Sequence, residues 1–164
     1  MAKQYRAVSG KINEITALAA GTGKGCLFYV DCVDGQGEPF QVLITAATYV
    51  YENKRLQVGM DCTFWFDANA PMVLIYPPRY VAAFAAENKE GRMMDVSYFG
   101  KKLVNTTNSL LLIPGKKTEV IAMNNQFYVG ELGGNYLMVE YGVSTRSIPA
   151  QTTPKRIVVL RNRV

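Results

Sequence analysis

The sequence predicts an all-β protein made of two similar, diverged units that pack together. Short β-prone segments are separated by Gly, Pro and Asn turn signals along the whole chain, a spacing typical of β-sandwiches and small barrels. No segment has the length and period of an ordinary helix. One set of segments also recurs in the same order about 70 to 76 residues later, as expected for a structural duplication.

The recurring segments define the alignment of the two units. Residues 48–50 match 118–120, residues 63–66 match 137–141, residues 71–75 match 147–149, and residues 80–84 match 156–160. The most polar stretch, within residues 87–93, is the expected linker, which gives a first unit at 1–86 and a second unit at 94–164. Units of this size fold alone only marginally, so we expect them to pack on each other.

The first unit is expected to contain strands at residues 5–15, 26–33, 40–44, 60–66, 72–76 and 80–86. Gly10 indicates a bend or bulge in the first strand. The turn residues 34–39 between two β-prone runs predict a hairpin. The four alanines of 80–86 favour helix, but the repeat favours strand.

The second unit is expected to contain strands at residues 95–99, 109–113, 119–123, 126–132, 136–141 and 156–164. Asn124-Asn125 predicts a two-residue turn, because Asn tolerates a positive φ. The last strand is a candidate for addition to the sheet edge of a neighbouring copy.

About five strands per unit, with a bent first strand and a long central hairpin, resemble the oligonucleotide/oligosaccharide-binding barrel (OB-fold) used twice. Segments 69–80 and 144–154 also resemble segments of uncharacterised β-rich proteins of Gram-positive, spore-forming bacteria. That second resemblance implies a non-enzymatic protein and supplies no catalytic residue.

The inventory of catalytic groups is small. The chain has no histidine, which removes the commonest general base, the commonest metal ligand and every Ser-His or Cys-His arrangement. Residues 21–25 differ from a phosphate-binding loop, because Gly25 stands where Ser or Thr is required. Asp31, Asp34 and Glu38 fit a solvated turn better than a calcium loop. We therefore expect no enzyme activity, no cofactor and no metal.

Cysteine content and hydropathy bear on the compartment. Cys26, Cys32 and Cys62 fit neither a disulfide framework nor a zinc site, and we expect buried thiols. No signal peptide or membrane-spanning segment is apparent, so synthesis in the cytoplasm is expected. The final location stays open, with the spore or cell surface among the candidates.

Charge and aromatic residues supply the candidate binding residues. Residues 1–86 hold seven Lys/Arg and seven Asp/Glu, whereas residues 87–164 hold eleven and six, so the net charge of +5 lies in the second unit. Only one of Trp65 and Phe64 can face a barrel interior, because strand side chains alternate. The candidate aromatics and their basic neighbours are Trp65, Tyr29, Tyr128, Tyr141, Arg79, Lys155, Arg156 and Arg161.

Three functions fit these features. The first is a structural, self-associating protein that forms a fibre, coat or other ordered assembly. The second is an OB-type protein that binds single-stranded nucleic acid, or another anionic partner, at the basic second unit. The third is a protein-binding adaptor.

Overall fold

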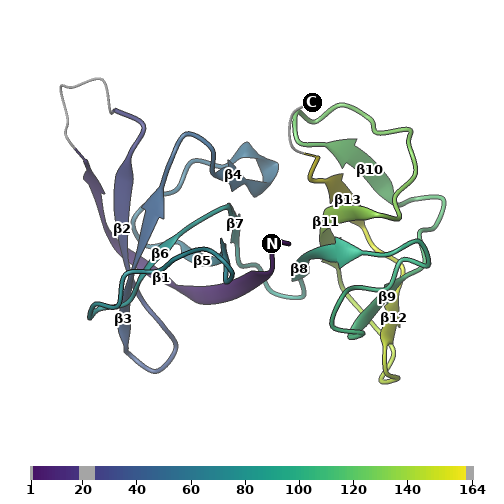
Figure 1. The fold of residues 1–164 in the computed structure, drawn as a ribbon, viewed down its shortest axis with the longest axis horizontal. Coiled ribbons are helices and arrows are strands. Elements are labelled where there is room, and N and C mark those ends of the chain that lie inside the picture. The colour runs from purple at the N-terminus through teal and green to yellow at the C-terminus, as the bar shows by residue number, and fades with distance from the viewer. Residues whose placement is uncertain (1, 19–24, 162–164) are drawn as a thin grey trace. The chain divides into compact units, whose positions relative to one another are not determined.

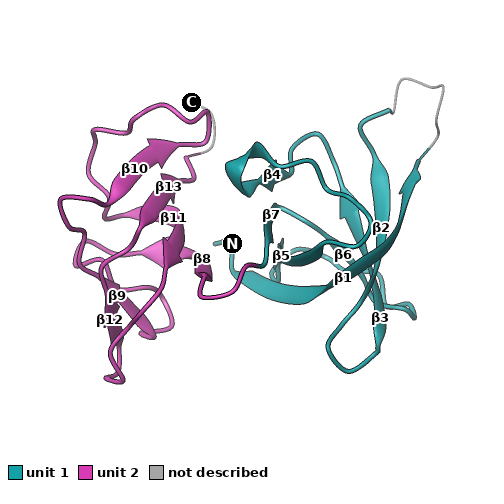
Figure 2. Cartoon of the chain, turned by 180° about the vertical axis from the view of Figure 1, so that it is seen from behind, with its two compact units in different colours: residues 1–88 teal, residues 89–164 magenta. Residues whose placement is uncertain are grey.

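The computed structural model describes residues 2–18 and 25–161, and within these ranges its regular structure is β, apart from one 3₁₀ turn at Tyr51–Asn53 (Figure 1). The all-β prediction is confirmed, and the sheets are mixed, with parallel and antiparallel pairs. In the described ranges no helix is long and apolar enough to cross a membrane. The chain divides into two compact units, Met1–Asn88 and Lys89–Val164 (Figure 2).

Unit 1 contains a seven-stranded sheet in the order β4-β7-β5-β1-β2-β3-β6. Its strands are β1 (Tyr5–Ala17), β2 (Phe28–Val33), β3 (Pro39–Ile44), β4 (Tyr49–Val50), β5 (Asp61–Asp67), β6 (Arg79–Val81) and β7 (Phe84–Glu87). Only Ala82 and Ala83 separate β6 from β7, yet β6 pairs with β3 while β7 pairs with β5. The pairings therefore form a closed circuit from β1 through β2, β3, β6/β7 and β5 back to β1.

The core of unit 1 is apolar and lies on one face of these strands. Its buried members are Ile12, Val30, Cys32, Phe40, Val42, Cys62, Phe64, Ala82 and Ala85. A side chain at Gly10 would place its Cβ 2.5 Å from the Val33 carbonyl oxygen, so this position requires glycine. The register shift in β1 lies between Ile12 and Glu14, two residues beyond the predicted site of the bend.

Unit 2 contains a four-stranded sheet, β10-β13-β11-β8, and a two-stranded sheet, β12-β9. Its strands are β8 (Met93–Phe99), β9 (Leu110–Leu112), β10 (Glu119–Ala122), β11 (Asn135–Tyr141), β12 (Ala150–Thr152) and β13 (Arg156–Val159). Between β8 and β9 in the sequence, Val104 and Asn105 form a short bridge that pairs with both strands. The Gly100 N–H donates to the Val104 carbonyl, and the Asn105 N–H donates to the Leu110 carbonyl (both 3.0 Å). This segment occupies the topological position of β2.

The strand pairings of the two units correspond. The order β10-β13-β11-β8 repeats β4-β7-β5-β1 with the same directions, and β9 pairs with β12 in parallel as β3 pairs with β6. The Ala83 N–H donates to the Trp65 carbonyl (2.8 Å), and the Lys155 N–H donates to the Glu140 carbonyl (2.8 Å). These bonds match residues 63–66 with 138–141, which lies inside the predicted range 137–141. They also match Phe84 with Arg156, so the predicted alignment of 80–84 with 156–160 is wrong by four residues.

Several predicted boundaries are corrected. Residues 72–76 are a loop and not a strand, and only Phe127 of 126–132 makes a bridge. β13 ends at Val159 between β10 and β11, so it offers no free edge to a neighbour. Glu87 ends β7 and Met93 begins β8, which shortens the connection to residues 88–92. Tandem OB barrels stay a prediction, because short strands of this kind also fit a β-solenoid of about three turns.

Candidate functional site

The most exposed apolar segment among the described residues is the loop between β5 and β6. We call residues 72–76 the apolar loop: Met72, Val73, Leu74, Ile75 and Tyr76. All five side chains are exposed, with Leu74 at 97% and Tyr76 at 75%. No charged residue lies between Asp67 and Arg79. A continuous, uncharged and exposed apolar segment is the usual mark of an interaction site.

Hydrogen bonds hold both ends of this segment. At its start the Asp67 carboxylate accepts from the Asn69 N–H at 3.0 Å, and Asn69 Nδ2 donates to the Ala2 carbonyl at 2.6 Å. At its end the Gln41 N–H donates to the Pro78 carbonyl at 2.8 Å. The Tyr76 hydroxyl donates to Glu38 Oε2 at 3.3 Å, and the nearby carboxylate raises the pKa of Tyr76. The apolar loop is thus presented from anchored ends.

Beside this loop, a polar ladder crosses the outer face of β2, β3 and β6. Arg79 Nε donates to Gln41 Oε1 at 2.7 Å, and Gln41 Nε2 donates to Asp31 Oδ1 at 2.9 Å. The Arg79 guanidinium lies 4.6 Å from the centre of the Tyr29 ring. The structure thus brings together two of the predicted binding residues, Tyr29 and Arg79. It also covers the Tyr29 ring with a cation, so that ring face is not free for stacking.

The two sides of β5 separate Phe64 from Trp65. Phe64 belongs to the unit 1 core, whereas Trp65 lies on the opposite face beside its strand partners Ala7 and Phe84. Trp65 is nevertheless buried, with 4% exposure. It therefore offers little surface to a partner, which argues against its place among the candidate binding residues.

Tyr128 and Tyr141 are also engaged within unit 2. Both pack against its apolar core, and the Tyr128 hydroxyl donates to the Glu131 carbonyl at 3.1 Å. Burial, together with the charge of Asp95, raises the pKa of Tyr141. Both rings are partly buried, so each offers less surface for base stacking than a fully exposed aromatic would.

Two of the predicted basic residues have acidic partners. Lys155 Nζ lies 3.7 Å from Glu140, and Arg156 Nε donates to Glu119 Oε1 at 3.1 Å. Arg161 is exposed close to the end of the described chain. The charge available for an anionic partner is therefore smaller than the residue count indicates.

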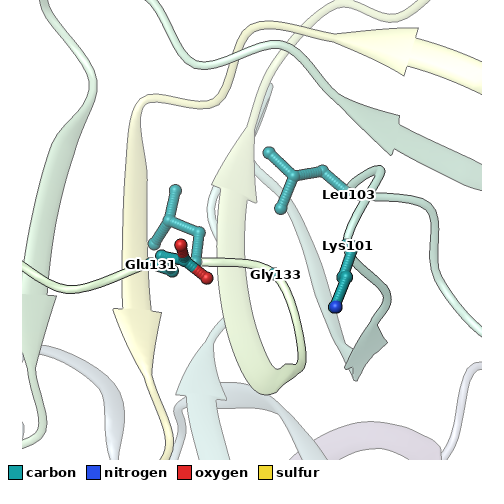
Figure 3. Close-up of a pocket in the computed structure, with 5 residues that line it drawn as sticks. Lys101, Leu103, Glu131 and Gly133 are labelled. Atoms are coloured by element: carbon teal, nitrogen blue, oxygen red, sulfur yellow. The ribbon is translucent and has the colours of Figure 1, made fainter.

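A shallow depression of about 510 Å³ lies in unit 2 (Figure 3). Lys101 and Leu103 line it from the segment after β8, and Glu131, Leu132 and Gly133 line it from the segment before β11. Its volume would suit a small molecule, but one lysine, one glutamate and two leucines do not indicate a ligand class. Gly133 permits the close approach of the two segments, because a Cβ there would lie 2.7 Å from the Lys101 Cα.

The remaining chemical groups have structural roles. Asp34 Oδ1 accepts from the N–H groups of Gln36 and Glu38 at 2.9 Å, which orders the hairpin turn. Among the described residues no group of His, Cys, Asp and Glu could hold a metal ion. Of the glycine-rich segment 21–25, residues 21–24 lie outside the described residues.

The three thiols differ in environment. Cys32 and Cys62 are buried, and burial raises the pKa of each thiol to about 12. Cys26 is exposed, in contrast with the prediction of a buried thiol. The two buried thiols are therefore protonated and poorly nucleophilic at neutral pH.

Sequence reasoning missed the apolar loop as a binding segment, because five apolar residues in a row also fit a buried strand. The signal lay in the flanking residues: Pro71 precedes the run and Pro77-Pro78 follows it. Prolines on both sides remove backbone donors that a central strand needs. No family model, curated protein or solved structure matches the chain.

Proposed function

We propose that this chain is a non-enzymatic structural subunit that associates with copies of itself, and that the apolar loop is its principal contact. The observation that carries the proposal is the row of five exposed apolar side chains at residues 72–76. Their removal from water would be favourable by about 25 cal/mol per Å² of apolar surface. The absence of histidine supports a role outside acid–base or metal catalysis.

We also propose that each unit is a diverged OB-like barrel and that the pair arose by duplication. The closed circuit of pairings in unit 1 and the matching strand order in unit 2 support both ideas. The antiparallel neighbours β1–β2 and β2–β3 are hairpins, whereas the coils of a solenoid stack mainly through parallel strands. A barrel of this kind is a compact scaffold that leaves its loops available for contacts.

Single-stranded nucleic acid is the second candidate partner, and the electrostatics favour it less. The outer face of β2 and β3 is where OB barrels bind such ligands, and here it carries Asp31 next to the covered ring of Tyr29. Lys155 and Arg156 are close to carboxylates. In favour of nucleic acid, the Lys155 side chain stays 75% exposed. The third candidate, an adaptor, would use the apolar loop for a different protein.

Size-exclusion chromatography with light scattering, at low salt and at about 1 M NaCl, tests the proposal, because ionic contacts are screened within about 3 Å at the higher salt. We expect the wild type to be larger than a monomer in both buffers. Leu74→Ser should weaken association about 10- to 100-fold, since a buried leucine contributes about 1.5–3 kcal/mol. Val58→Ser is the matched control, because Val58 is an exposed apolar residue of unit 1 outside the loop.

Two outcomes would contradict the proposal. A wild type that stays monomeric across a wide concentration range in both buffers would remove self-association. Equal effects of Leu74→Ser and Val58→Ser would remove the apolar loop as the contact. Titration of a labelled oligothymidylate then tests the second candidate, for which binding should weaken steeply with salt.

A further inference from the structure

One exposed carboxylate of unit 1 contacts the apolar loop. The Tyr76 hydroxyl contacts Glu38, and the Glu38 side chain is exposed at the hairpin turn. Residues 25–53 contain four acidic residues and no Lys or Arg: Asp31, Asp34, Glu38 and Glu52. We call the apolar loop together with Glu38 the acidic patch. It combines an uncharged apolar segment with one carboxylate at its edge.

The corresponding loop of unit 2, between β11 and β12, has the same apolar character. Val143 is 90% exposed and Ile148 is 88% exposed. Arg146 lies between them and is also exposed. We call Val143, Arg146 and Ile148 the basic patch. After Glu140 the chain contains five Lys/Arg and no acidic residue.

The loop that carries the basic patch is ordered by its own hydrogen bonds. The Gln151 N–H donates to Thr145 Oγ1 and the Thr145 N–H donates to the Gln151 carbonyl, both at 2.9 Å. Thr152 Oγ1 donates to the Val143 carbonyl at 2.6 Å. A preorganised loop loses little conformational entropy on binding, which favours a specific contact.

We infer that the acidic patch of one copy docks on the basic patch of a second copy, with Glu38 opposite Arg146 at the rim. This inference rests on the proposed self-association and specifies its geometry. Two acidic patches would place two carboxylates at one interface, and two basic patches would place two guanidinium groups there. The unlike pairing joins apolar surfaces and also places opposite charges at the same interface, so attraction adds to apolar burial. Such a contact is heterologous, so it leaves one patch of each kind free for the next copy.

Charge reversal tests the pairing. Glu38→Arg and Arg146→Glu should each weaken association about tenfold in low salt, because attraction at the rim becomes repulsion. An equimolar mixture of the two variants should restore association, since each then meets an opposite charge at both contacts. The double variant E38R/R146E in one chain should do the same. Lys117→Glu is the control, because Lys117 is an exposed base of unit 2 outside the basic patch.

Sedimentation velocity gives the readout, and circular dichroism of each variant shows that the fold is kept. One outcome overturns the pairing but leaves the proposed function standing. In that outcome the wild type assembles, Leu74→Ser fails to assemble, and Arg146→Glu associates as strongly as Lys117→Glu. Single variants that weaken association but are not restored by mixing also overturn the pairing. A monomeric wild type overturns the proposed function itself.

Discussion

Thr48 and Thr118 make the same two hydrogen bonds in the two units. Thr48 Oγ1 accepts from the Thr45 N–H (3.0 Å) and donates to the Ala82 carbonyl (2.8 Å). Thr118 Oγ1 accepts from the Gly115 N–H (2.9 Å) and donates to the Pro154 carbonyl (2.7 Å). Each hydroxyl fastens the turn before an edge strand, β4 or β10, to the segment that pairs with it.

Replacing either threonine with valine should destabilise its own unit by a similar amount. Thr48→Val and Thr118→Val keep the side-chain shape but remove both hydrogen bonds, at a cost of about 1–2 kcal/mol in the free energy of unfolding. Urea titration measures the cost, with Trp65 fluorescence reporting unit 1 and circular dichroism reporting both units. Thr153→Val, at an exposed position, is the control. Unchanged stability in both variants would show that the shared bonds contribute nothing.

Gly10→Ala should destabilise unit 1 by about 1–3 kcal/mol, the usual cost of overpacking. The added Cβ would lie 2.5 Å from the Val33 carbonyl oxygen and 2.7 Å from Phe40 Cε1. Gly35→Ala is the matched control, since a Cβ there has no neighbour within 4 Å. Thermal unfolding compares the two variants. Equal midpoints would mean that β1 moves freely away from β2.

The thiols should react with iodoacetamide in two classes. Burial raises the pKa of Cys32 and Cys62 to about 12, so the reactive thiolate is scarce at neutral pH, whereas Cys26 is exposed. Mass spectrometry of the native protein should show one modification, and denatured protein should show three. Rapid modification of all three thiols in the native state would contradict the burial of this pair.

Asp95→Asn should change how the stability of unit 2 depends on pH. Burial raises the pKa of Asp95 above its ordinary value, although hydrogen bonds from Ser97 and Asn105 act in the opposite direction. A carboxyl with a raised folded-state pKa favours the folded state below the unfolded pKa, about 3.9, and this contribution is lost as pH rises through the folded value. The asparagine variant lacks this loss, so its stability relative to wild type should rise with pH. Urea titrations from acid to neutral pH measure the difference, and a constant difference would contradict it.

The sequence correctly predicted features that depend on a local residue pattern, such as turns. The turn residues 34–39 correctly indicated the β2–β3 hairpin, and the match of Thr48 with Thr118 agrees with their hydrogen bonds. The sequence-based alignment of the two units was wrong where strand pairing depends on segments that are distant in the sequence. Phe84 corresponds to Arg156, and two residues of such different chemistry give no sequence signal. The backbone bonds to Trp65 and Glu140 and the registers of the paired strands reveal this correspondence.

The candidate site was harder to predict for the same reason. A strand period shows that Trp65 and Phe64 face opposite ways, but it does not show that both are buried. The basic character of Lys155 and Arg156 was visible, whereas their neighbours Glu140 and Glu119 come from other strands. Burial and ion pairing depend on tertiary packing, so they cannot be predicted from the sequence of one segment alone.

The prolines around the apolar loop limit how it can associate. Five apolar residues lie between Pro71 and Pro77-Pro78, one fewer than the six or seven that form a steric zipper. Because proline has no amide hydrogen, a cross-β ladder cannot continue through either end of the segment. The prolines therefore act as gatekeepers against amyloid growth. The loop presents side chains for a specific contact while its main chain is a poor template for aggregation.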